Sequence, residues 1–179
     1  MSDFGTRLDD QTVQFSRLVH GPIERVWSYL TDAELRGKWF AGGPMEPRVG
    51  GKADWVFANA AIGPEPRTVP ERFQKYVGPF DSKHVVTIWE PPHRLGFTWD
   101  SNLDPKGSEV VVELSKEGDK IRLVLTHKRL ADVAAVTDVS GGWHTHLLML
   151  AEILEGHPTT PFWSALDVAN KEYQKRYRG

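Results

Sequence analysis

Four short segments between residues 84 and 128 alternate apolar and polar residues, and only turn sequences separate them. They span 84–90, 94–100, 108–115 and 120–128. A period of two is typical of β-strands with one buried face, and such short connections join antiparallel neighbours. One face of this sheet is strongly apolar and collects Leu95, Phe97, Trp99, Val110, Val112, Leu114, Ile121, Leu123 and Leu125. An apolar sheet face needs a cover, so we expect a helix to lie against it.

The chain supplies that cover directly after the strands. Beyond a loop expected at 130–139, apolar residues recur at helical spacing at Trp143, Leu147, Leu150 and Leu154. The pattern predicts a core-facing helix over 143–155, which begins after Ser140-Gly141-Gly142 and ends at Gly156. We expect the glycine pair to let the start of this helix approach the sheet closely.

The beginning of the chain predicts a strand followed by two short helices. The strand covers 12–20, and Pro22 is well placed as the first residue of the first helix. Thr31 and Glu34 form an S/T-x-x-E capping box, which predicts a second short helix over 31–39.

The middle of the chain adds one more strand and an irregular stretch. The strand covers 52–59, and the proline-broken stretch 60–82 carries a short helix at 71–77. Together the elements predict an α+β fold. A curved antiparallel sheet of about six strands wraps on a long C-terminal helix, with two short helices after the first strand.

A chain of 179 residues corresponds to a single domain, and its ends differ from its centre. Residues 1–12 read as a flexible polar lead-in, and 13–156 as the helix-grip domain. Residues 157–179 predict an extra C-terminal helix, packed on the domain or at a dimer interface. Its Phe162, Trp163 and Tyr173 would be unfavourable to leave in water.

Composition excludes several classes of function. The chain has no cysteine, so it has no disulfide, thiolate metal site or thiol nucleophile. A net charge of −2 gives no basic field for nucleic acid, and no run of 18 apolar residues could span a membrane. Residues 1–14 lack the apolar core of a secretory signal, so we expect a cytoplasmic protein. Neither a phosphate-binding glycine loop nor a G-x-S-x-G elbow is present.

Several sequence pieces carry a resemblance to a known family and follow one another in order. They are Pro22-Ile23-Glu24-Arg25-Val26-Trp27, Leu30-Thr31-Asp32, Trp39-Phe40, Val49-Gly50-Gly51, Glu90-Pro91-Pro92-His93-Arg94-Leu95, Phe97-Thr98-Trp99, Ser108-Glu109-Val110, Leu125-Thr126-His127 and Gly141-Gly142-Trp143. Over residues 13–155 the chain resembles the helix-grip, START-like (SRPBCC) superfamily. Within it, the chain is most similar to bacterial homologues of the activator of the 90-kDa heat-shock protein ATPase. The insertion 60–82 and the tail 157–179 depart from that pattern.

The resemblance implies a cavity between the curved sheet and the C-terminal helix. Many relatives bind apolar small molecules there, some transport lipids, and some cyclise or dehydrate polyketides. The co-chaperone function belongs to eukaryotic relatives with a further domain, so it is not inferred here. The candidate ligand-binding residues are Trp39, Phe40, Trp55, Phe57, Phe97, Trp99, Leu123, Leu125, His127, Trp143, His146, Leu147 and Leu150. Aromatic walls suit an apolar or ring-bearing ligand, although the same residues could simply fill the core.

Two histidines are the candidates for acid–base chemistry. His127 ends the apolar stripe of its strand and should face the helix, and His146 shares the helix's inward stripe. Either could instead be a hydrogen-bonded core residue. His144 and His146 lie two positions apart on a helix and cannot both bind one ion, so we predict no metal site and no cofactor.

The leading hypothesis is a small binding protein that holds an apolar or aromatic molecule in an internal cavity. One alternative is a non-metal cyclase- or hydrolase-like enzyme that uses His127 or His146. A second alternative is a protein-interaction module resembling the chaperone activators. A homodimer is possible, whereas nucleic acid is not an expected partner.

Overall fold

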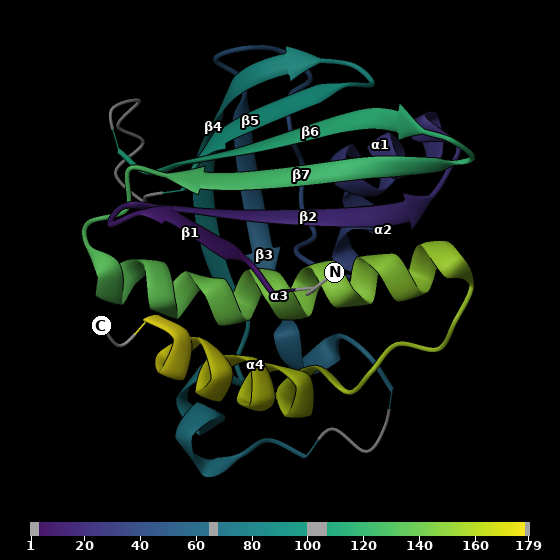
Figure 1. The fold of residues 1–179 in the computed structure, drawn as a ribbon. Helices are drawn as coiled ribbons and strands as arrows, with labels where there is room; N and C mark the ends of the chain where they lie inside the picture. Colours follow the sequence, from purple (N-terminus) through teal and green to yellow (C-terminus); the bar gives the residue numbers. More distant parts are fainter. Residues whose placement is uncertain (1–3, 65–67, 100–106, 178–179) are drawn as a thin grey trace.

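The computed structural model describes residues 4–64, 68–99 and 107–177. A single seven-stranded sheet curls over a long helix, and every neighbouring pair of strands is antiparallel (Figure 1). The sheet order is β1-β2-β7-β6-β5-β4-β3. The strands are β1 Thr6–Asp9, β2 Thr12–His20, β3 Lys52–Phe57, β4 Phe80–Glu90, β5 Arg94–Thr98, β6 Glu109–Glu117 and β7 Lys120–Lys128. This arrangement confirms the predicted α+β helix-grip fold.

Two short helices lie between β2 and β3 in the sequence, and two longer helices follow β7. They are α1 Ile23–Thr31, α2 Ala33–Gly37, α3 Val133–Glu155 and α4 Phe162–Tyr177, with 3₁₀ turns η1 Asn59–Ala61 and η2 Glu71–Tyr76. The residue that caps α2 is Asp32, whose side chain accepts hydrogen bonds from the amides of Glu34 and Leu35. The predicted cap, Thr31, instead ends α1.

The first strand is the element that the sequence analysis missed. Thr6 pairs with Gln14, so part of the expected flexible lead-in 1–12 belongs to the sheet and gives seven strands rather than six. All four residues of β1 are exposed, so no apolar alternation marks this strand. The segment is held from α4: the Gly5 amide donates to the Tyr173 hydroxyl at 2.6 Å, and the Tyr177 hydroxyl donates to the Gly5 carbonyl at 2.9 Å.

The cover helix α3 begins ten residues earlier than predicted. Asp132 caps it by accepting a hydrogen bond from the Ala135 amide, so the expected loop 130–139 is largely helical. Its stripe of Trp143, Leu147, Leu150 and Leu154 is buried against the sheet, as the spacing predicts. Gly141 does not face the sheet: a Cβ built there would meet Asn170 of α4, which packs along α3 (Figure 1).

The close approach of α3 and α4 at Gly141 leads to a testable prediction. A Cβ at Gly141 would lie 1.6 Å from the Asn170 Oδ1 atom and 3.4 Å from its Cα, so the Asn170 side chain must leave its position. We expect Gly141→Ala to lower the free energy of unfolding by about 1–2 kcal/mol in urea denaturation.

The neighbouring glycine provides a matched control. A Cβ at Gly142 meets nothing within 4 Å, so Gly142→Ala should be neutral or stabilise the helix by about 0.5–1 kcal/mol. The double variant Gly141→Ala, Asn170→Ala should recover most of the loss, because it removes the atoms that clash. If the two single alanine variants had equal stability, the helix contact would not be the constraint at Gly141.

Candidate functional site

Phe40 lies at the centre of an aromatic cluster between the sheet and α3. Its ring centroid lies 5.3 Å from that of Trp39, 5.7 Å from Trp55 and 5.1 Å from Trp143. It also packs against Phe57 at 4.9 Å. The cluster therefore joins the chain after α2, the edge strand β3 and the cover helix, and much of the large aromatic content of the chain lies in this one place.

A buried arginine fixes the chain that carries Phe40. The Arg36 side chain donates to the carbonyls of Ala41 at 2.9 Å and Thr31 at 3.0 Å, and to that of Gly43. Its guanidinium carbon lies 4.8 Å from the centroid of Trp55, a cation–π contact. Burial lowers the pKa of Arg36 to about 10, which still leaves it charged at neutral pH. The side chain therefore links the end of α1 to the segment after α2 from inside the core.

The space between the sheet and α3 is filled in this structure. Only about 10 Å³ is free there, which is no more than one water molecule would need. The residues around it are Leu30, Arg36, Trp39, Phe40, Trp55, Leu95, Phe97, Val112, Leu123, Leu125, Trp143 and Leu147. The sequence allows these aromatic residues either to line a ligand site or to fill the core, and most of them here fill the core.

An open aromatic groove lies beside this filled core and encloses about 370 Å³. We call it the aromatic groove; it is lined by Phe40, Phe57, Asn59, Phe80, Ser82, Trp99, Asp138, Val139, Gly142, Trp143 and His146. Phe40 and Trp143 belong to both linings, so their stacked rings form the wall between the core space and the groove. The groove is thus open space in the same cluster that the sequence predicts as a ligand site.

The candidate residues divide between these two places. Phe57, Trp99 and His146 line the aromatic groove, together with the shared Phe40 and Trp143. The core space is lined by Trp39, Trp55, Phe97, Leu123, Leu125 and Leu147. His127 and Leu150 line neither the core space nor the aromatic groove. The sequence analysis missed Asn59, Phe80, Ser82, Asp138, Val139 and Gly142, because each lies in or next to a stretch that was expected to be loop or strand end. Whether these residues bind a ligand stays a prediction.

His127 is completely buried and both of its ring nitrogens are occupied. The Trp143 indole N–H donates to His127 Nδ1 at 3.0 Å, so the proton of the neutral ring is on Nε2 and is donated to the Ser108 hydroxyl oxygen at 2.9 Å. Burial lowers the pKa of His127 to about 3. The ring is therefore neutral and ties β7, α3 and the start of β6 together.

His146 differs because it reaches the aromatic groove. Its Nδ1–H donates to the Trp39 carbonyl at 2.6 Å, which leaves Nε2 as an acceptor. Burial lowers the pKa of His146 to about 4, so the ring stays neutral at physiological pH.

Among the residues that the structure describes, no group of three or more His, Cys, Asp or Glu side chains could hold a metal ion.

The buried histidines make stability depend on pH. In the folded protein burial lowers the pKa of His84, His127 and His146, whereas in the unfolded chain all three take up a proton near pH 6.5. Their contribution is therefore complete above pH 6.5 and is lost progressively as the pH falls toward the folded values. We expect the free energy of unfolding to drop by about 3 kcal/mol between roughly pH 7 and pH 5.5, measured by urea denaturation.

Two glutamine variants separate this effect from general acid sensitivity. His146→Gln should remove about a third of the pH dependence in that range, since one of the three buried rings is gone. His20→Gln should leave it unchanged, because His20 is exposed. An equal pH dependence in all three proteins would contradict the assignment to the buried rings.

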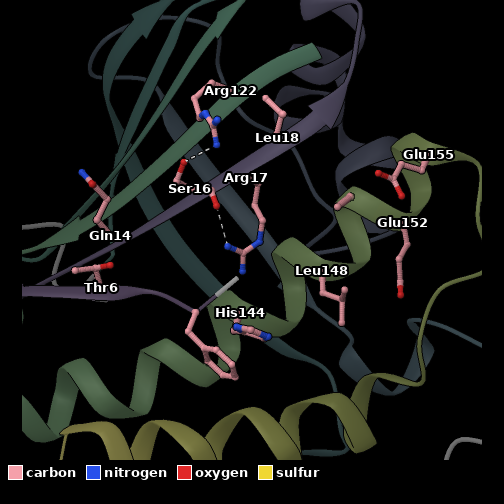
Figure 2. A pocket seen from close by; sticks show the side chains of 12 residues that line it. Thr6, Gln14, Ser16, Arg17, Leu18, Arg122, His144, Leu148, Glu152 and Glu155 are labelled. Carbon is pink, nitrogen blue, oxygen red and sulfur yellow. Dashed lines mark hydrogen bonds between the residues drawn. The ribbon is translucent and has the colours of Figure 1, made fainter. Parts of the chain in front are cut away.

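A second concavity of about 700 Å³ lies on the other side of α3, next to β2 (Figure 2). Its wall mixes apolar and charged side chains. Arg122 donates to the Ser16 hydroxyl at 3.2 Å and pairs with Glu117, and Arg17 donates to the Ser16 carbonyl at 3.0 Å. No candidate residue of the sequence analysis lines it. Unlike the described lining of the aromatic groove, it contains two arginines.

The model of one protein family matches residues 20–155, which is most of the chain, and its description is Activator of Hsp90 ATPase homolog 1-like protein. The chain belongs to this family. Among proteins with curated functions, none matches it. This membership confirms the predicted START-like relationship.

Solved structures of several bacterial proteins have the same fold. A Bordetella parapertussis protein is 44% identical, with a TM-score of 0.82 over 98% of this chain and 91% of the other. CalU16 from Micromonospora echinospora is 22% identical, with a TM-score of 0.65 over 94% and 89%. The Aha1 dimer from Colwellia psychrerythraea is 15% identical, with a TM-score of 0.59 over 80% and 96%. The last two likenesses concern the fold alone.

Within the described part of the chain, none of the helices has the length and apolarity required to cross a membrane.

Proposed function

We propose that the protein binds a small, ring-bearing apolar molecule in the aromatic groove. The observation that carries the proposal is open space of about 370 Å³ walled by Phe40, Phe57, Trp99 and Trp143. This volume falls within the roughly 300–1,000 Å³ of known small-molecule sites, which also have mostly apolar walls and few polar groups. The family relationship supports the proposal, because START-like relatives bind apolar molecules against the same sheet and helix.

The first experiment compares the native mass of the freshly purified protein with its denatured mass. A non-covalent adduct of small mass would supply the ligand for identification.

The same spectrum tests the predicted homodimer through residues 157–179, which stays a prediction. One structural neighbour is described as a dimer. A protein-interaction role also stays a prediction, to be examined by affinity capture from its own host.

The second experiment blocks the groove. Gly142 lies on its wall, and an added Cβ there meets nothing within 4 Å, so Gly142→Phe should fill the groove without disturbing the core. We expect binding of 2-naphthol, followed by tryptophan fluorescence, to weaken at least about tenfold. Ala134→Phe, on an exposed position of the same helix, is the matched control and should bind as the natural protein does. Equal weakening by both variants, or no binding to the unaltered protein, would contradict the proposed site.

A further inference from the structure

Several side chains in the lining of the aromatic groove carry hydrogen-bond acceptors. His146 uses its only N–H on the Trp39 carbonyl, and its one hydrogen bond among the described residues leaves Nε2 as an acceptor. Asn59 places its Oδ1 in a buried position without a hydrogen-bond partner in the described part of the chain. Asp138 adds a carboxylate. An acceptor that lines the groove gives a ligand with a donor a hydrogen bond that a purely apolar ring cannot form.

The charge of the aromatic groove points in the same direction. Its described lining contains one carboxylate, that of Asp138, and neither lysine nor arginine. An anionic ligand would therefore lose its hydration without gaining a counter-ion. By contrast, the concavity on the other side of α3 has Arg17 and Arg122 in its wall.

We propose that the aromatic groove selects uncharged aromatic molecules that carry a hydrogen-bond donor, such as a phenolic hydroxyl, over anionic or donor-free rings of the same size. This inference rests on the proposed function and specifies its ligand class. His146 Nε2 receives the donor, and the rings of Phe40, Trp99 and Trp143 hold the aromatic body. Selection against anions comes from Asp138 and from the lack of a cation in the described lining.

Three probes with the same ring system test the proposal on the full chain. They are 2-naphthol, which has a donor, 2-methoxynaphthalene, which has none, and 2-naphthoate, which is an anion. We expect 2-naphthol to bind about five- to tenfold more tightly than 2-methoxynaphthalene, the usual effect of one neutral hydrogen bond. We expect 2-naphthoate to bind most weakly. Isothermal titration calorimetry near pH 7 measures all three.

Two variants assign the preference to residues. His146→Leu removes an acceptor, so 2-naphthol should lose most of its advantage over 2-methoxynaphthalene. Asp138→Asn, at an exposed position that should not affect folding, should bring 2-naphthoate closer to the other probes. Asp119→Asn, in an exposed turn outside the groove, should change none of the three affinities.

The outcomes distinguish this inference from the proposed function. If 2-naphthol and 2-methoxynaphthalene bind equally well, or if 2-naphthoate binds most tightly, the selection is refuted while the aromatic groove remains a binding site. Loss of the preference in Asp119→Asn as well would refute the assignment to groove residues. If no probe binds, both the inference and the proposed function are refuted.

Discussion

Replacing Arg36 by methionine is expected to lower the free energy of unfolding by about 3 kcal/mol. Methionine has a similar length but no donor, so the carbonyls of Thr31, Ala41 and Gly43 lose their partner inside the core. Leaving a buried carbonyl without a hydrogen bond is unfavourable by about 1–3 kcal/mol, and the apolar side chain offsets part of the total. Urea denaturation near pH 7 measures the difference.

Arg48→Met is the matched control for this change. The Arg48 side chain is 64% exposed and pairs with Glu46 on the surface, so its loss should alter stability by less than about 0.5 kcal/mol. Equal effects of the two substitutions would mean that the unfavourable free energy of burying the Arg36 charge cancels the stabilisation from its hydrogen bonds. In that case Arg36 would not be what stabilises the chain around Phe40.

Gly43→Ala is expected to be at least as damaging, with a loss of about 3 kcal/mol or more. Gly43 has φ +94°, and a Cβ there would lie 2.3 Å from the Asp54 carbonyl oxygen. The clash is with backbone, so the chain before β3 must move, and the Gly43 carbonyl that accepts from Arg36 moves with it. Thermal and urea denaturation should both show the loss.

Gly118→Ala separates the clash from the backbone conformation. Gly118 also has a positive φ, of 63°, but a Cβ there meets nothing within 4 Å. This variant should therefore lose only the roughly 1–2 kcal/mol that a left-handed alanine costs. Similar losses at the two glycines would show that the close approach to Asp54 adds nothing.

The elements with a strong apolar period could be predicted from the sequence, and those without one could not. Apolar and polar residues alternate clearly in the strands from β4 to β7, and apolar residues recur at helical spacing in α3. The predicted helix-grip fold is confirmed. β1 was missed because all of its side chains are exposed. The start of α3 was placed too late because Gly141 and Gly142 were interpreted as a helix boundary, whereas Asp132 is the cap. The glycines instead lie inside the helix.

The candidate site could be predicted only as a set of aromatic residues. Whether a ring borders open space or fills the core depends on side-chain packing around Phe40, which periodicity does not determine. Arg36 was missed for a related reason: an arginine on a short helix is normally exposed, and only the carbonyls that surround it explain its burial. Asp138 and Gly142 were missed because the segment that carries them was expected to be a loop or the start of a helix.

The bonds between Gly5 and α4 make the two ends of the chain one structural unit. Both backbone groups of Gly5 are held by tyrosines of the last helix, and the Arg176 guanidinium carbon lies 4.1 Å from the ring centroid of Phe4. Removing either end therefore exposes the other, so a short N-terminal truncation and a C-terminal truncation should have the same consequence for proteolysis. The neighbouring positions of the ends also make this fold a natural scaffold for circular permutation, with new ends placed in the turn at Gly118.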